Sequence, residues 1–348
     1  MRRATAPRTR PIVRIASAFA AGLAFCLGAY LLIDYARPDT LISISFLILL
    51  PGMVTAFIAT IADPMGERPR RFYTWQVPAG LLGAVIVASI VFLREGTICI
   101  VMLAPIWLLS GAAGGALAYR FFGTPPEEGA GVVRSSALLL VPVLAMQLEP
   151  VLPVPVAQVA VTRSIVVRAD PATIWPLAQG VGRIGATEGR WNITQSLIGL
   201  PRPESARLIG RGVGAIRDVR WQQHLNFQEV ITDWQPGTRI WWHFRFAGKD
   251  LARWGLQDRH LLPDGPAYRI SEGGYTLQPL GNGRTRLTLT TRYLVRTPVN
   301  WYARAWGELF LGDVSNNVLA VIADRAEKAQ GVAPGVAASM SPPPVSLK

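Results

Sequence analysis

Four long apolar runs in the first 120 residues constrain this chain more than any other feature. None of them contains Asp, Glu, Lys or Arg, and each is long enough for a helix to cross the roughly 30 Å hydrocarbon core of a bilayer. Lipid cannot hydrogen-bond to exposed peptide groups, so such runs cross membranes as helices. The absence of charge favours a helical anchor over an ion or proton pathway. We expect membrane spans at residues 15–33, 41–62, 77–93 and 97–119.

A fifth apolar run, Ala137–Leu148, is shorter and contains Pro142. It reaches spanning length only when residues 135–154 are counted together. We expect this segment to be a fifth span, which makes residues 1–154 a membrane region. Only 16% of all residues are charged, against about a quarter in ordinary soluble domains, which argues against a wholly soluble protein.

The basic residues beside these runs predict the orientation, because cytoplasmic connections carry an excess of Lys and Arg. Ten arginines flank the spans on the side of the N-terminus, and two flank them on the other side. The N-terminus is therefore expected in the cytoplasm. With five spans the C-terminal domain lies in a periplasmic space, whereas with four it is cytoplasmic. We expect the first arrangement, in a multi-pass protein of a cell membrane of the bacterial inner-membrane type.

The second half of the chain has the hydrophobic period of two that is typical of β-strands. The pattern predicts strands at 159–168, 212–222, 225–234, 238–246, 267–280 and 284–295, an irregular region at 185–208, and a long helix at 298–328. An antiparallel sheet with one apolar face needs a cover, which the helix provides. We expect an α+β domain at residues 155–330 and a disordered tail at 331–348.

Three segments of this domain resemble a known family. They are Ser164–Trp175 (SIVVRADPATIW), Phe227–Gly237 (FQEVITDWQPG) and Gly273–Leu280 (GGYTLQPL). Together with the last hairpin and the long helix, they are similar to the START/SRPBCC superfamily, which includes polyketide cyclases. The resemblance covers Val161–Lys328 and implies a helix-grip fold, in which a curved antiparallel sheet surrounds a long C-terminal helix. It is specific for the fold rather than for a function, because the superfamily includes lipid carriers, hormone receptors, cyclases and oxygenase subunits.

Alternation and helical phase direct a set of mostly aromatic side chains into the space between the sheet and the long helix. A glycine within the helix removes side-chain bulk and is expected to leave open space there. The alternative for each aromatic residue is an ordinary place in the core. The expected lining of a ligand cavity is Trp242, Phe244, Tyr275, Tyr293, Trp306, Leu309 and Gly312.

Two carboxylates are weak candidates for catalysis in the same space. Asp313 lies near the sheet-facing stripe of the long helix, and Glu229 shares a strand face with apolar residues. Either could act as a general base or orient a ligand hydroxyl. The alternatives are a solvated position for Asp313 and a salt bridge to a nearby arginine for Glu229. The second half contains no cysteine and no Gly-x-Ser-x-Gly motif, which leaves no convincing nucleophile.

Four arginines alternate onto the outward faces of the predicted strands, where they can meet anionic lipid headgroups. Ordinary solubility and hydrogen bonding are the alternative. These residues are Arg239, Arg245, Arg286 and Arg292.

The sequence therefore predicts a membrane-anchored protein whose helix-grip domain binds a hydrophobic small molecule or a lipid. The alternative is a cyclase- or hydrolase-like enzyme that acts on a hydrophobic ligand in the same cavity. Membrane lipids and the ligand are the expected partners, and no nucleic acid, cofactor or metal is expected. Gly210–Ala215 matches a dinucleotide-binding fingerprint, but a strand is predicted where the fingerprint needs a helix.

Overall fold

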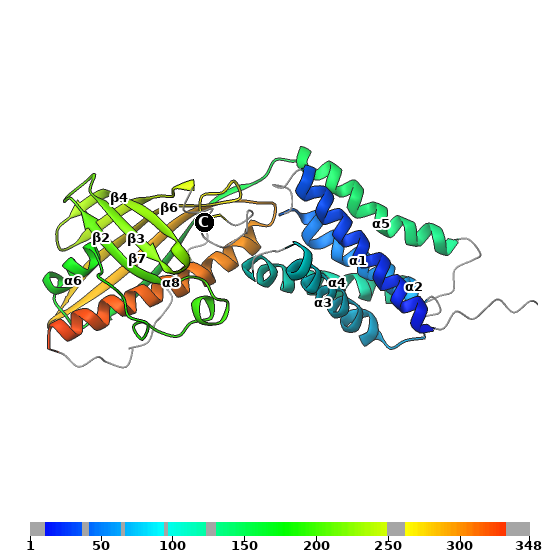
Figure 1. Cartoon of the computed structure of the whole chain (residues 1–348), viewed down its shortest axis with the longest axis horizontal. Helices are drawn as coiled ribbons and strands as arrows, with labels where there is room; N and C mark the ends of the chain where they lie inside the picture. Colours follow the sequence, from blue (N-terminus) through cyan, green and yellow to red (C-terminus); the bar gives the residue numbers. More distant parts are fainter. Residues whose placement is uncertain are drawn as a thin grey trace, which may run out of the picture. The chain divides into compact units, whose positions relative to one another are not determined.

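The computed structural model describes residues 11–36, 42–63, 67–93, 97–122, 130–248 and 262–331. The chain divides into two compact units (Figure 1). The first comprises residues 1–155 with 297–299, and the second comprises residues 156–296 with 300–348. The expected disordered tail lies outside the described residues, apart from Gly331.

The described part of the N-terminal unit is helical. Its elements are α1 (Pro11–Ala36), η2 (Ser45–Leu49), α2 (Leu50–Ala62), η3 (Phe72–Gln76), α3 (Val77–Ala88), η4 (Ser89–Leu93), α4 (Thr97–Phe122), α5 (Ala130–Leu148) and η5 (Glu149–Val151). Four helical segments are long and apolar enough to cross a membrane, namely Ile12–Tyr35, Ser45–Ala62, Phe72–Phe92 and Ile98–Arg120. The fifth helix, α5, has 19 residues.

Proline and glycine explain two features of this bundle, its wider helical turns and the close packing of α2 against α4. The π-helical turns η2 and η3 each lead into a helix with proline in its first turn, Pro51 and Pro78. Proline has no N–H and its ring clashes with the preceding turn, which explains the wider turns there. A Cβ on Gly114 would lie 2.7 Å from the Cα of Gly52, so α2 and α4 can pack this closely only because residue 114 is a glycine.

The C-terminal unit contains one antiparallel sheet of seven strands in the order β1-β7-β6-β5-β4-β3-β2. The strands are β1 (Val156–Val167), β2 (Pro203–Ile209), β3 (Ile216–Trp221), β4 (Asn226–Gln235), β5 (Arg239–Arg245), β6 (Tyr268–Gly281) and β7 (Arg284–Arg296). Edge strand β2 lies largely in the region 185–208, which was expected to be irregular because it is rich in glycine, proline and arginine. Between β2 and β3 the Gly210–Ala215 motif is a hairpin loop, and β3 follows where a dinucleotide site would need a helix.

Two helices cover the inner face of this sheet, α6 (Pro171–Gln179) and the 30-residue α8 (Asn300–Ala329) (Figure 1). Along β7, buried residues alternate with exposed ones, so only one face of the strand contributes to the core. The core joins strand residues such as Ile240 and Leu287 to Leu319 and Ile322 of α8. The structure thus confirms a helical N-terminal unit followed by an antiparallel sheet with a long C-terminal helix, and the sheet has seven strands where six were predicted.

Candidate functional site

An aromatic cluster covers the inner face of β4, β5 and β6. Trp242 is buried, and its ring lies 5.3 Å from Tyr275 and 6.2 Å from Phe244, measured between centroids. Phe244 is half-buried and also contacts Phe227 and Phe246. Three of the residues expected to line a cavity, Trp242, Phe244 and Tyr275, therefore lie together. Burial raises the pKa of Tyr275 to about 12, so its hydroxyl stays protonated.

A buried ion pair lies within this cluster. Arg217 of β3 and Glu229 of β4 are register partners, and the Arg217 guanidinium donates to the Glu229 carboxylate. Their side chains are only 4% and 8% exposed. Arg217 also donates to the carbonyl of Ala178 at 2.7 Å, and its guanidinium lies 4.1 Å from the Trp242 ring centroid. Burial raises the pKa of Glu229, while the charge of Arg217 opposes the shift.

Glu229 thus points inward and is bonded to an arginine. Sequence reasoning did not single out Arg217. The alternation of the strand could have indicated it, because Arg217 shares its strand face with Val219, which is buried.

Two buried donors on the inner face have no hydrogen-bond partner within the described part of the chain, Trp242 Nε1 and Tyr293 Oη. Tyr293 is 1% exposed and packs against Tyr268, with ring centroids 5.0 Å apart. Burial, together with the nearby Glu308, raises the pKa of Tyr293 to about 12. Its hydroxyl lies against Gly307 of α8, where a Cβ would come within 2.7 Å of the Tyr293 Cζ.

The space expected beside Gly312 is occupied by Arg163 of β1. A Cβ on Gly312 would lie 2.9 Å from the guanidinium carbon of Arg163. The Arg163 side chain is 18% exposed and pairs with Glu308 at 2.7 Å. The glycine therefore makes room for an arginine of the same domain at this position.

Asp313 bonds to the α6–β2 connection, which we define as residues 180–202. Its Oδ2 accepts from the backbone N–H and the hydroxyl of Thr194 at 2.9 and 2.8 Å. One turn later, Asn317 accepts from the Arg190 N–H at 2.7 Å and donates to Gln195 at 2.6 Å. Asp313 thus attaches a segment to α8, which is a positional role rather than that of a free general base.

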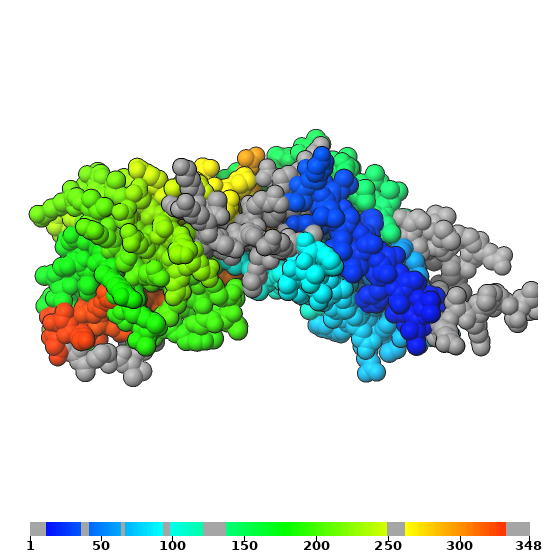
Figure 2. Space-filling model, viewed as in Figure 1, coloured from blue at the N-terminus to red at the C-terminus, as the bar shows by residue number. Residues whose placement is uncertain are grey.

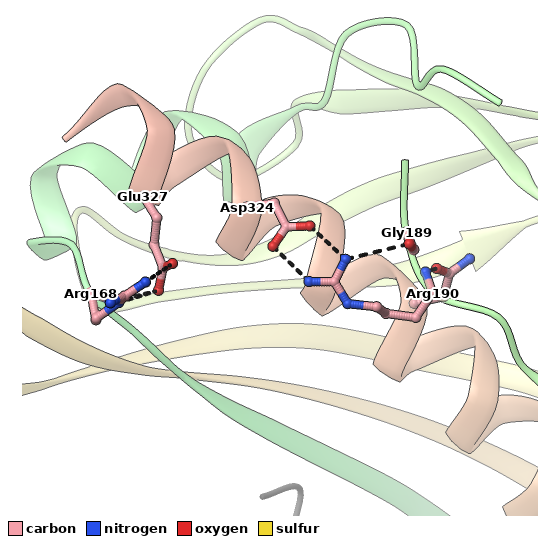
Figure 3. A network of polar contacts seen from close by, with 6 residues as sticks. Arg168, Gly189, Arg190, Asp324 and Glu327 are labelled. Atoms are coloured by element: carbon pink, nitrogen blue, oxygen red, sulfur yellow. Dashed lines mark hydrogen bonds and ion pairs between the residues drawn. The ribbon is translucent and has the colours of Figure 1, made fainter. Parts of the chain in front are cut away.

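Further polar contacts continue along the C-terminal half of α8 (Figure 3). Arg190 forms a two-pronged ion pair with Asp324, with both distances 2.9 Å. Glu327 accepts from the backbone and side chain of Arg168 at the end of β1. Arg325 binds Glu188 through two bonds of 2.8 Å, which lower the pKa of that carboxyl to about 2. The connection and the end of β1 are therefore held firmly on α8.

Trp306 belongs to a separate ladder of rings on the first turns of α8. Trp301, Tyr302, Trp306 and Phe310 contact one another in sequence, with centroid distances of 5.5, 6.2 and 5.3 Å. Trp306 and Leu309 are half-buried. The ring contacts thus place Trp306 and Trp242 in two different clusters.

The outward arginines have partners on the outer face of the sheet. Arg239 pairs with Asp233 at 2.9 Å and Arg292 pairs with Glu272 at 3.1 Å. Both guanidiniums lie over the ring of Trp241, 5.1 and 4.7 Å from its centroid. Arg286 donates to Gln278 at 3.4 Å, and Arg245 is exposed. Carboxylates thus neutralise part of the charge that was expected to face lipid.

The described residues contain no group of three or more His, Cys, Asp or Glu side chains that could hold a metal ion. Comparison with protein-family models gives no match, and comparison with curated proteins gives none. Solved structures do match the C-terminal half. Truncated norcoclaurine synthase from Thalictrum flavum is 16% identical with a TM-score of 0.31, and 51% of this chain and 96% of that chain are covered.

An aromatase/cyclase, Zhui, from a Streptomyces species is 14% identical with a TM-score of 0.31, with 50% and 96% covered. The protein XoxI from Bacillus cereus is 14% identical with a TM-score of 0.30, with 49% and 97% covered.

Proposed function

We propose that this chain is a membrane-anchored binding protein whose C-terminal unit holds a hydrophobic small molecule or lipid between the sheet and α8. Six buried side-chain atoms have no partner in the described part of the chain, and the observation that carries the proposal is that two of them, Trp242 Nε1 and Tyr293 Oη, lie on the aromatic inner face. Buried polar groups are nearly always hydrogen-bonded, so these two call for an acceptor. Aromatic walls with a few buried polar groups are typical of sites for apolar ligands.

The N-terminal unit supplies the anchor, and one contact in it supports five crossings. Glu149, directly after α5, accepts from the backbone N–H groups of Ile44 and Ser45 at 2.7 and 2.9 Å. The end of α5 therefore lies beside the start of the second span. That span starts on the side opposite to the N-terminus, because α1 has crossed once. The helix α5 has 19 residues and extends about 28 Å, and its apolar part, Ala137–Val151, is shorter than the four long apolar helices.

This arrangement gives a topological prediction. Reporter fusions that end at Arg134 and at Val156 should report opposite sides of the membrane, the first cytoplasmic and the second periplasmic. The reason is that α5 crosses between the two points. The measurement is the activity of a reporter that works on one side only, with a fusion at Ala36 as the control for the periplasmic side. Cytoplasmic signals from both fusions would show that α5 does not cross.

The ligand itself can be sought by native mass spectrometry of the full chain released from membranes. We expect an added mass that organic extraction removes. Trp242→Phe and Tyr293→Phe each delete one donor and keep the ring, so each should lower occupancy by about threefold to tenfold, which corresponds to one hydrogen bond. Trp241→Phe is the matched control, because its indole nitrogen is equally unpartnered but belongs to the outer face. A protein that carries no extractable mass would contradict the proposal.

An enzyme acting on the same ligand is the second candidate, and the inward Arg217–Glu229 pair favours it. A carboxylate beside a ligand could act as a general acid or base. The Glu229→Gln variant separates the two functions. An enzyme would leave this variant holding an unconverted ligand of a different mass from that in the natural protein. A carrier would hold the same mass in both, at lower or equal occupancy.

A further inference from the structure

Four inward side chains of the C-terminal unit contact one another, and we call them the Arg217 cluster. Its members are Arg217, Glu229, Trp242 and Tyr275. The Arg217 guanidinium donates to Glu229 and lies 4.1 and 5.7 Å from the ring centroids of Trp242 and Tyr275. Figure 2 shows β3–β5 in yellow-green at the surface of this unit, whereas the cluster belongs to the inner face and each member is less than one-tenth exposed.

The cluster holds more hydrogen-bond donors than the protein uses. A guanidinium donates from each of its nitrogens, Nε, Nη1 and Nη2. Within the described part of the chain, Arg217 donates from Nε to Glu229 and from Nη1 to the Ala178 carbonyl, and its Nη2 has no hydrogen bond. The buried Nε1 of Trp242 has no partner there either. Because buried donors are nearly always satisfied, the cluster calls for oxygen acceptors from a ligand.

A glycine helps to fix the position of the free indole N–H. Trp242 of β5 is the register partner of Gly273 on β6. A Cβ on Gly273 would lie 2.9 Å from Nε1, Cε2 and Cζ2 of the indole, so the ring lies directly against the backbone of β6. The Arg217 guanidinium lies over the same ring. The N–H group is therefore held in place before a ligand binds, which lowers the entropic cost of binding.

The charge of the cluster decides which acceptors are suitable. Glu229 already balances the positive charge of Arg217 inside the unit. A ligand carboxylate beside Arg217 would also lie close to Glu229, and two carboxylates that share a buried site repel each other. A neutral carbonyl or ester oxygen accepts the same N–H groups without bringing a second negative charge into the interior.

We propose that the C-terminal unit selects apolar ligands whose polar end is a neutral carbonyl or ester oxygen, and that it disfavours free carboxylates and plain hydrocarbons. Arg217 Nη2 and Trp242 Nε1 donate to the polar end, and Glu229 excludes the carboxylate. This inference rests on the proposed function, because it requires a ligand between the sheet and α8, and it adds the chemical class of that ligand.

The test compares methyl palmitate, palmitate and hexadecane, which have the same chain length and differ at one end. Each is added to the full chain in detergent micelles, and native mass spectrometry gives its affinity, corrected for its partition into the micelles. Methyl palmitate should bind at least about tenfold more tightly than palmitate, the smallest effect typical of two neighbouring carboxylates. It should bind at least about threefold more tightly than hexadecane, the effect of one hydrogen bond.

The Glu229→Gln variant tests the role of the charge, because glutamine keeps the size of the side chain and an oxygen that accepts from Arg217. The ratio of the affinities for methyl palmitate and palmitate should fall at least about tenfold, because the positive charge of Arg217 is then unbalanced and attracts the carboxylate. Asp233→Asn is the matched control on the same strand. Asp233 pairs with Arg239 on the outer face, so this ratio should not change.

The Gly273→Ala variant tests the role of the indole. The new methyl group displaces the Trp242 ring, so the preference for methyl palmitate over hexadecane should decrease. Gly274→Ala is the control, because its methyl group meets Trp241 on the outer face instead, and the preference should persist.

Tighter binding of palmitate than of methyl palmitate by the natural chain would overturn the proposal, and this comparison needs no variant. An unchanged ratio in Glu229→Gln, or an equal shift in Asp233→Asn, would overturn it as well. Equal affinity for all three probes would refute the selectivity and leave the proposed function standing. Binding of none of them would contradict the proposed function and this inference together.

Discussion

Replacing Glu229 with alanine is expected to lower the free energy of unfolding of the C-terminal unit by about 3–5 kcal/mol. The change leaves the Arg217 guanidinium buried without its carboxylate, in surroundings where both side chains are less than one-tenth exposed. An unpaired buried charge is far more costly than the loss of one contact, because no water replaces the missing partner. Hydrogen exchange of β3 and β4 peptides in the full chain measures the effect, since it reports the stability of this sheet directly.

A matched control lies on the same strand. Asp233 pairs with Arg239, but these side chains are 32% and 44% exposed. Asp233→Ala should therefore cost only about 0–1 kcal/mol, because water solvates the remaining charge. If Glu229→Ala and Asp233→Ala lower the free energy of unfolding equally, water reaches the Arg217–Glu229 pair in solution, and the expectation based on its burial is wrong.

A variant that removes both charges distinguishes the contribution of the ion pair from the cost of leaving one charge unpaired. The double variant Arg217→Met/Glu229→Leu fills a similar volume without ions, and such replacements are often neutral or stabilising. We expect it to recover about 2 kcal/mol or more of the loss caused by Glu229→Ala. Full recovery is not expected, because Arg217 also bonds the Ala178 carbonyl at the end of α6. The double variant is also useful for function, because it removes the inward carboxylate of Glu229, a candidate general acid or base, while keeping the fold.

Periodicity predicted most of the fold because it reports which face of an element meets the core. Six of the seven strands and the long helix follow the alternating or helical placement of apolar residues. The strand β2 was not predicted, because an edge strand buries little on either face and its sequence therefore need not alternate. The start of α5 was not predicted either, because the helix begins at Ala130, before the apolar run starts.

The candidate site was harder to predict, since alternation gives the direction of a side chain and not what it meets. Trp242 and Tyr275 point inward as expected, and they contact a cationic side chain that a core position does not suggest. Gly312 was expected to leave a space, and Arg163 fills it from a strand 149 residues earlier in the chain. Asp313 was expected at a cavity wall, and its oxygen instead binds Thr194. Such pairings depend on tertiary structure that no local pattern contains.

The second large effect is on the stability of the C-terminal unit, and it comes from substitutions at two glycines of α8, Gly307 and Gly312, which serve as a matched pair. Gly307→Ala should destabilise the unit by about 1–3 kcal/mol more than Gly312→Ala. Both changes gain the same helix propensity, about 1 kcal/mol, so the difference isolates what each new methyl group meets. At Gly307 it meets the buried ring of Tyr293, which Tyr268 holds from the other side. At Gly312 it meets the end of Arg163, a flexible side chain whose partner Glu308 is 52% exposed.

A rescue variant tests whether the destabilisation by Gly307→Ala comes from the Tyr293 hydroxyl, whose oxygen is the atom nearest to the new methyl group. Tyr293→Phe removes that oxygen, so the double variant Gly307→Ala/Tyr293→Phe should be more stable than Gly307→Ala alone, and the two changes should not be additive. Exchange rates of peptides from β7 and α8 provide the measurement. Strict additivity would mean that the hydroxyl does not face Gly307 in solution. Contact with Gly307 leaves the hydroxyl proton free to donate, so the lower ligand occupancy expected for Tyr293→Phe is measured separately from this stability cycle.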